Sequence, residues 1–202
     1  MDPRVEQIID RYYPAGTPLR DIFLNHSQSV ARLALELNGH LRRPLPEADV
    51  ESAALLHDVG IFLTHAPSIE CRGSEPYIRH GMLGADLLRS AGLPELWARV
   101  CERHTGSGLT AGEIAERRLP LDPERDYMPR TMLEKLVCYA DKFFSKSGSR
   151  RCKNVREVED SMLRHGAESL ERFKELEGEI ARESVMPPRL TVERAAAAMW
   201  RH

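Results

Sequence analysis

The chain has 202 residues, of which 42% are hydrophobic and 30% charged, a composition typical of a globular protein with one full core. Its net charge of −2 lacks the strongly basic balance of a dedicated duplex-DNA binder, whereas a small phosphorylated ligand needs only a local positive patch. We therefore expect a small phosphorylated partner and no duplex nucleic acid.

The sequence shows no sign of a membrane span or of a disulfide framework. No apolar run approaches the roughly 18 residues of a spanning helix, and the first residues, MDPRVEQIIDRYYPAG, lack the basic-then-apolar layout of a signal peptide. The four cysteines form no CxxC pair and are interpreted as reduced thiols: Cys71, Cys101, Cys138 and Cys152. These features predict a cytoplasmic protein that makes no membrane contact.

The helical period dominates the pattern of apolar residues, and no segment shows the alternation of a strand. A polar loop that carries proline and glycine occupies 64–76. Around this loop we expect four helices, over about 19–41, from Pro46 to Gly60, over 77–90 and over 94–104.

Two capping boxes follow, Thr110–Glu113 and Thr131–Glu134. The first predicts a short helix, and the second predicts a long helix that runs through Asp141 to about residue 145. The basic stretch at 145–154, which also carries glycine and serine, is interpreted as a mobile connection.

The last part of the chain has its own amphipathic pattern. Apolar residues over 155–180 predict one helix lying across the bundle, Met-Pro-Pro at 186–188 would end it, and alanine-rich 193–200 favours a last short helix. The expected fold class is all-α. We expect a main domain over 1–150 and a C-terminal helical extension, 151–202, packed on the same domain.

Six polar side chains lie where the helical pattern calls for apolar residues, and they are distributed over five expected helices: His26, His57, Asp58, His80, His104 and Asp141. A single buried histidine is usually a hydrogen-bonded core residue. Six such groups are costly to bury separately, whereas one cation compensates several of them at once. The pattern therefore predicts a shared metal centre.

Histidine and aspartate ligands without cysteine suit iron, manganese or zinc. The six candidates exceed the three or four protein ligands of a single catalytic ion, which leaves room for two ions roughly 3.5–4 Å apart, bridged by a carboxylate. Asp58 is the favoured bridge, because His57 ties it to the first ion. We expect two divalent ions, iron or manganese, with zinc, nickel or magnesium as alternatives.

Four motifs occur in a familiar order: ALLHDVG, RHGMLGADLL, ERHTGSG and LEKLVCYADKF. Over about residues 20–146 the chain resembles the HD-domain metal-dependent phosphohydrolases, in the subgroup with an HDIG-type signature. The resemblance implies an α-helical bundle and hydrolysis of phosphoester or phosphoanhydride bonds, often in nucleotides. It also implies one ion held by His26, His57, Asp58 and Asp141, and a second held with the help of His80 and His104.

The chain departs from many of these relatives at Ile61, where they carry a basic residue that meets the substrate phosphate. That contribution is either missing or comes from elsewhere. Among nearby cations, Lys142, Arg103 and Arg79 are candidate phosphate contacts, with Lys142 favoured, although each could equally be a solvated helix charge.

We expect a metal-activated water to attack phosphorus in line, with Asp58 as the central catalytic carboxylate. His65, in the 64–76 loop, is a candidate proton donor to the leaving group, with a surface histidine as the alternative. The basic cluster that includes Lys146 and Lys153 is interpreted as a solvated face that could steer an anionic substrate. His40, His165 and His202 carry no pattern and receive no role.

Several functions remain open at this point. Within the hydrolases, the segments around His104 and Asp141 are similar to the HD-type symmetrical diadenosine tetraphosphate hydrolases, but Ile61 fits that group poorly. A metal- or nucleotide-binding sensor without activity and an iron-dependent oxygenase on the same scaffold are alternatives of other classes. The substrate, the native metals and a homodimeric state are not determined by the sequence.

Overall fold

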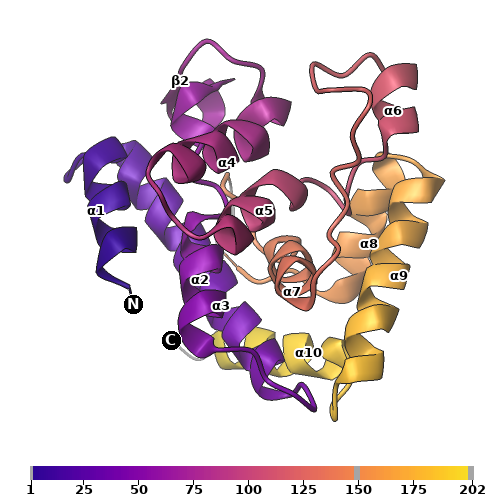
Figure 1. The fold of residues 1–202 in the computed structure, drawn as a ribbon. Helices are drawn as coiled ribbons and strands as arrows, with labels where there is room; N and C mark the ends of the chain where they lie inside the picture. Colours follow the sequence, from indigo (N-terminus) through magenta and orange to yellow (C-terminus); the bar gives the residue numbers. More distant parts are fainter. Residues whose placement is uncertain (1, 148–150, 200–202) are drawn as a thin grey trace.

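The computed structural model describes residues 2–147 and 151–199. Helices make up most of it, so the all-α prediction is confirmed (Figure 1). The α-helices are α1 (Pro3–Tyr12), α2 (Pro18–Gly39), α3 (Glu47–Leu56), α4 (His80–Ser90), α5 (Glu95–Arg103), α6 (Ala111–Glu116), α7 (Met132–Asp141), α8 (Val155–Arg164), α9 (Ala167–Glu183) and α10 (Pro188–Met199).

The expected loop at 64–76 contains a small hairpin. Its antiparallel strands are β1 (His65–Ala66) and β2 (Cys71–Arg72), with a 3₁₀ turn, η2 (Pro67–Ile69), between them. Two further 3₁₀ turns flank this hairpin, η1 (Ile61–Leu63) before it and η3 (Tyr77–Arg79) directly before α4.

Local capping explains where several helices begin. Thr110 and Glu113 form the predicted reciprocal capping box at α6, and the Thr131 side chain caps α7 by accepting from the backbone N–H of Glu134. The first helix, α1, was not anticipated; it begins with Asp2 as N-cap and a proline in its first turn.

Helix α7 occupies the centre of the bundle, and α2, α3, α5 and α9 all pack against it (Figure 1). Its side chains are buried around most of its circumference, including Leu136, Val137, Tyr139 and Ala140. Burial of most of this helix fixes the position of its last residue, Asp141, deep inside the molecule.

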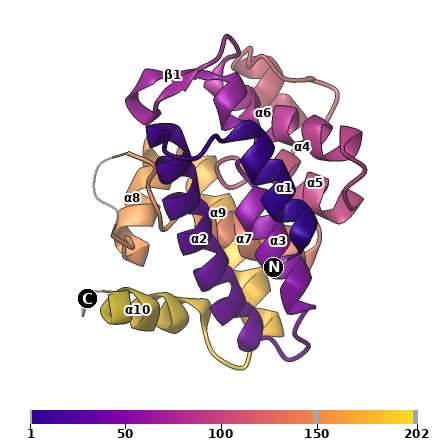
Figure 2. The same cartoon turned by 90° about the vertical axis from the view of Figure 1, so that its left-hand side faces the viewer.

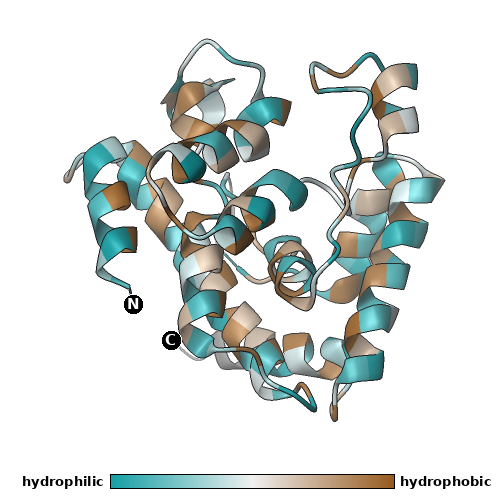
Figure 3. Cartoon of the chain, in the orientation of Figure 1, coloured by the Kyte–Doolittle hydropathy of each residue, from teal (hydrophilic) through white to brown (hydrophobic). Residues whose placement is uncertain are grey.

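The prediction of one continuous helix over 155–180 is wrong, because the chain breaks at Gly166. This residue has a φ of 123°, a backbone conformation that side-chain-bearing residues rarely adopt. The result is two helices, α8 and α9, that pack side by side (Figure 1). Hydrophilic and hydrophobic residues alternate along α9, as expected for a helix with one buried face (Figure 3).

The C-terminal helices share the core of the preceding bundle. The ring of Phe173 on α9 stacks on Tyr139 of α7, with ring centroids 5.4 Å apart, and α10 packs against α2 (Figure 2). The division at residue 150 stays a prediction. Of the connection expected to be mobile, residues 148–150 lie outside the described part. Within 2–147 and 151–199, no helix has the length and apolar character to cross a membrane.

Candidate active site

The six polar residues singled out in the sequence lie together in the interior, in two groups that share Asp58. The first group contains His26, His57, Asp58 and Asp141, and the second contains Asp58, His80 and His104. Within each group the candidate ligand atoms lie within 4.8 Å of one another, and all six residues are buried. The structure thus brings together in one place the six side chains that the sequence pattern singles out.

Helix ends bring most of these residues together. His57 is the C-cap of α3, His80 is the first residue of α4, His104 is the C-cap of α5, and Asp141 is the last residue of α7. Only His26 comes from a helix interior, in the middle of α2. Helix ends carry backbone groups without helical partners, so they suit side chains that must point at a common centre.

The histidines outside α2 are oriented in the same way. Nδ1 of His57, His80 and His104 lies 2.6, 2.7 and 2.7 Å from the carbonyl oxygen three residues earlier in the chain. Each Nδ1–H therefore donates to the backbone, which leaves the Nε2 lone pair facing the interior. Metal-binding histidines usually donate their other ring N–H to a carbonyl or carboxylate in this way.

The facing atoms are crowded in a way that a metal cation among them would relieve. Nε2 of His80 lies 3.0 Å from Nε2 of His104, and each lies 3.3 Å from Oδ1 of Asp58. That oxygen is buried and has no hydrogen-bond partner in the described part of the chain. Two lone pairs and a carboxylate at these distances repel one another unless positive charge lies among them. The donor set therefore fits a divalent metal ion.

The first group carries more negative charge. Oδ2 of Asp58 lies 3.1 Å from Nε2 of His26, and Oδ1 of Asp141 lies 2.9 Å from the same atom. Burial alone lowers the pKa of His57, but the carboxylates of Asp58 and Asp141 outweigh it and raise that pKa to about 9. In the second group burial dominates and lowers the pKa of His80 to about 3.

Lys146 is a site residue that the sequence did not reveal. Its ammonium lies 2.6 Å from Oδ2 of Asp58, and its side chain is only 14% exposed. Burial disfavours both charges, yet the pKa of Asp58 is held well below its usual range by Lys146 and His57, and that of Lys146 is raised by Asp58. The interpretation of Lys146 as a solvated surface charge is therefore wrong. Lys146 lies in the turn after α7, so no helical period in the sequence indicates that it points inward.

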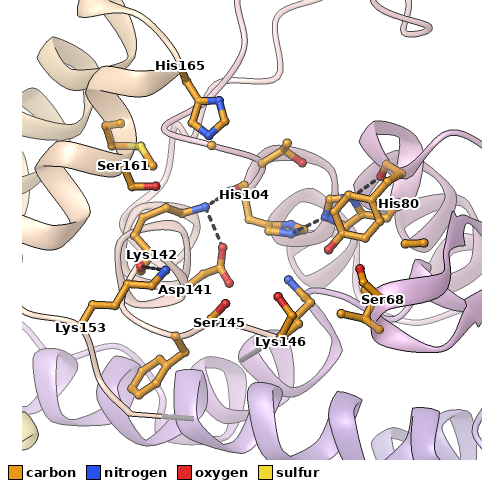
Figure 4. A pocket seen from close by; sticks show the side chains of 18 residues that line it. Ser68, His80, His104, Asp141, Lys142, Ser145, Lys146, Lys153, Ser161 and His165 are labelled. Atoms are coloured by element: carbon orange, nitrogen blue, oxygen red, sulfur yellow. Dashed lines mark hydrogen bonds and ion pairs between the residues drawn. The ribbon is translucent and has the colours of Figure 1, made fainter. Parts of the chain in front are cut away.

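A cavity of about 440 Å³ opens onto the site, and three lysines line it (Figure 4). The Lys142 ammonium lies 2.7 Å from Oδ2 of Asp141 and donates to the carbonyl oxygen of His104. Lys153 donates to the carbonyl oxygen of Lys142, and Lys146 completes the set. Serines and metal-site residues share this lining, among them Ser68, Ser145, Ser161, His80, His104 and Asp141.

Three other predicted residues do not line this cavity. Arg103 pairs with the buried carboxylate of Glu134 at 3.1 Å, and Arg79 pairs with Glu75. His65 is exposed on β1. The structure thus separates these side chains from the three lysines, and of the predicted phosphate contacts only Lys142 lines the cavity.

Gly60, which has no side chain, allows the two groups of candidate ligands to come together. A Cβ built on Gly60, the glycine of His57-Asp58-Val59-Gly60, would lie 2.3 Å from the carbonyl oxygen of His80 and 2.5 Å from the backbone nitrogen of Gly84. Only glycine permits this approach of α4 to the chain after α3. The motif therefore needs its glycine so that His80 can reach Asp58.

Comparison with known proteins agrees with this geometry. Residues 23–146 match the family model of the HD domain. Two solved structures of the HD domain of the L. monocytogenes phosphodiesterase PgpH have the same fold. The alignment with the first structure covers 96% of each chain, with a TM-score of 0.56 and 16% sequence identity. The alignment with the second, which is in complex with cyclic-di-AMP, covers 97% of this chain and 95% of that one, with a TM-score of 0.55 and 13% sequence identity.

Curated relatives match this chain over only part of their own length. A protein from Methanocaldococcus jannaschii, described as uncharacterized, is 37% identical over 121 residues, covering 58% of this chain and 63% of the relative. A tRNA (cytidine(56)-2'-O)-methyltransferase from Thermoplasma volcanium is 30% identical over 175 residues, covering 86% of this chain but 46% of the relative. The match thus spans 63% of the first relative and 46% of the second, less than two thirds of either.

The matched residues contain every member of both buried groups, from His26 to Asp141, and also Lys146. The buried His/Asp cluster indicates divalent metal binding, and the fold is that of HD-domain phosphodiesterases. The chain belongs to the HD-domain family.

Proposed function

We propose that the protein hydrolyses a phosphoester or phosphoanhydride bond in a nucleotide or a similar phosphorylated metabolite. One observation carries this proposal: two groups of buried candidate metal ligands share Asp58, and their members His80, His104 and Asp141 line a cavity that three lysines also line. Phosphoryl transfer depends mainly on positioning and on stabilising negative charge, and this cavity offers positive charge on both sides of the site.

The two groups would hold two divalent ions, with Asp58 as the shared ligand. His26, His57 and Asp141 would complete the first set, and His80 and His104 the second. When bound, such ions lower the pKa of a water molecule and neutralise charge on phosphoryl oxygens. The backbone carbonyls that accept from His57, His80 and His104 fix the rings, so that the protein needs little rearrangement to bind metal.

The lysines would supply the phosphate contact that is missing at Ile61. Ile61 is fully buried and uncharged, whereas Lys142, Lys146 and Lys153 line the cavity beside Asp141. Lysine binds phosphate as a point charge with three donors. The chain would therefore bind phosphate through residues that follow α7, far along the chain from position 61. No geometry supports a proton-donor role for exposed His65, which stays an untested prediction.

A panel of metals and substrates tests the proposal. Purified protein would be loaded separately with iron, manganese, zinc, nickel or magnesium and assayed with generic phosphoesters, nucleotides and cyclic dinucleotides; the last are included because one PgpH structure holds cyclic-di-AMP. We expect turnover of at least one nucleotide that depends on the metal. Metal-replete protein that binds nucleotides without hydrolysing them would instead indicate a sensor, and oxygen consumption by the iron form would indicate an oxygenase.

A further inference from the structure

A second cavity of about 330 Å³ adjoins the lysine-lined cavity. Five residues line both of them, so they lie directly side by side: Tyr77, His80, Thr105, Gly106 and His165. The volume of the second cavity falls at the lower end of the roughly 300–1,000 Å³ found for ligand pockets. A molecule held at the metal site could therefore extend into it without leaving the protein.

The two cavities differ in chemistry. The side chains of Ile78, Leu109 and Leu119 make much of the second cavity apolar. The ring of Tyr77 stands between the two cavities, stacked on the His80 imidazole with centroids 4.6 Å apart and an interplanar angle of 22°. An aromatic ring and aliphatic side chains at this distance from a metal site favour a flat, uncharged group.

The charged groups of the second cavity are largely paired with each other. Arg172 of α9 lies 2.7 Å from a carboxylate oxygen of Glu113 in α6, and both side chains are nearly buried. This pair is close to neutral, and the third charged residue of the lining, Arg117, is exposed at the C-terminal end of α6, so the buried part of the second cavity is a poor site for another phosphate. Its edge offers both hydrogen-bond donors and hydrogen-bond acceptors, as recognition of a nucleobase requires.

The wall of this cavity continues beyond the residues that match the HD family. His165, Ser169 and Arg172, from the turn before α9 and from α9 itself, line it and lie after residue 146. The hydroxyl of Ser107 donates to the carbonyl oxygen of Ser169 at 2.7 Å, which fixes α9 against the 105–109 turn. In Figure 4 the ring of His165, which comes from the turn before α9, points toward the lysine-lined cavity.

We propose that the second cavity binds the nucleobase and adjoining sugar of the substrate, with α9 supplying part of the specificity. The proposal rests on the proposed hydrolase function, because it names the group to which the cleaved phosphate is attached. The substrate class is then a nucleoside phosphate, in contrast to a sugar phosphate or an inorganic polyphosphate, because neither of these carries a flat, uncharged group that would fill the apolar cavity beside the phosphate site.

The test uses nucleosides, which lack the phosphate. Adenosine, guanosine, cytidine and uridine would be titrated into metal-loaded protein by calorimetry, and the tightest binder would be tested with two variants. Leu119→Glu places a charge in the second cavity. Leu121→Glu is the matched control, since Leu121 packs in the same small cluster as Leu119 but does not line the cavity.

We expect the wild type and Leu121→Glu to bind this nucleoside alike, and Leu119→Glu to bind it at least about tenfold more weakly. In the hydrolase assay, Leu119→Glu should lower kcat/KM for the nucleotide and leave ribose 5-phosphate unaffected.

Two outcomes would overturn the proposal: no nucleoside binding at millimolar concentration, or equal losses in the two variants. Nucleotide turnover without nucleoside binding would remove the subsite and leave the hydrolase standing. Nucleoside binding without turnover of any phosphoester would support the subsite and contradict the proposed hydrolase function.

Discussion

The two sides of Asp58 are built from similar rings but differ in charge. On the first side, the carboxylates of Asp58 and Asp141 meet His26 and His57, and the Lys146 ammonium neutralises part of their charge. On the second side, His80 and His104 share a single carboxylate oxygen, and burial keeps both rings neutral. Two carboxylates attract a cation more strongly than one, so the first side is expected to be the tighter metal site.

The largest effect is expected from Asp58→Ala, because this residue belongs to both sides. The variant should lose metal from both groups and turnover by at least about 1,000-fold, since bound ions contribute several kcal/mol to phosphoryl transfer. Metal content after dialysis and the rate with the best nucleotide measure this. Full activity in Asp58→Ala would contradict the mechanism proposed here.

A matched pair of variants tests the difference between the sides. His80→Ala should remove metal from the second side only and roughly halve the metal content, because one weak site of two is lost. His26→Ala removes a ligand from the first side, where the carboxylates remain. Metal binding on that side should therefore become weaker without being lost. Elemental analysis after treatment with increasing chelator distinguishes them. If His80→Ala emptied both sides, the sites would not be separable.

Lys146→Met should affect metal affinity and catalysis in opposite directions. Removing the ammonium that lies 2.6 Å from Asp58 leaves more negative charge for a metal on the first side, so affinity there should rise. The same change removes a phosphate contact, so KM for the nucleotide should increase by about tenfold. Lys135→Met, at a lysine paired with Glu179 away from the cavity, is the control. Unchanged metal affinity and KM would refute both roles.

A smaller effect is expected where the C-terminal helices join α7. The Tyr139 hydroxyl donates to Glu177 at 3.0 Å in a buried setting, and Glu177 also pairs with Arg189. Tyr139→Phe should lower the free energy of unfolding by roughly 1.5–3 kcal/mol, the range for a hydrogen bond to a charged group, and leave kcat unchanged. Urea denaturation measures the loss. A large fall in kcat would mean that α9 also positions Asp141.

The smallest effect concerns the pH dependence of stability at Glu113. Burial raises its pKa, but the Thr110 backbone and Arg172 outweigh burial and lower the pKa below its ordinary value. The ionised form is thus favoured by folding, so its stabilisation is present at neutral pH and is lost as the pH falls below about 4. Glu113→Gln should cost under about 1 kcal/mol at pH 7 and less at pH 3.5. A cost that grew on acidification would contradict this sign.

The sequence predicted the metal-binding groups well because each member breaks an apolar helical stripe. His26, for example, lies on the face of Val30 and Leu33, where a polar residue is conspicuous. Lys146 and His165 lack this signal, since both lie in turns between helices, where no period marks the inward direction. The break at Gly166 was hidden for a related reason: the apolar pattern resumes after it, and a single glycine is tolerated in many helices.

The close approach at Gly60 has a consequence for how this site tolerates change. Residue 60 binds nothing, yet a methyl group there would meet the carbonyl oxygen of His80 at 2.3 Å and would push α4 outward. His80 and the Tyr77 ring stacked on it would move together, because η3 runs directly into α4. One substitution without any functional group could thus widen the second half of the metal site and shift the wall between the phosphate and nucleoside cavities at the same time.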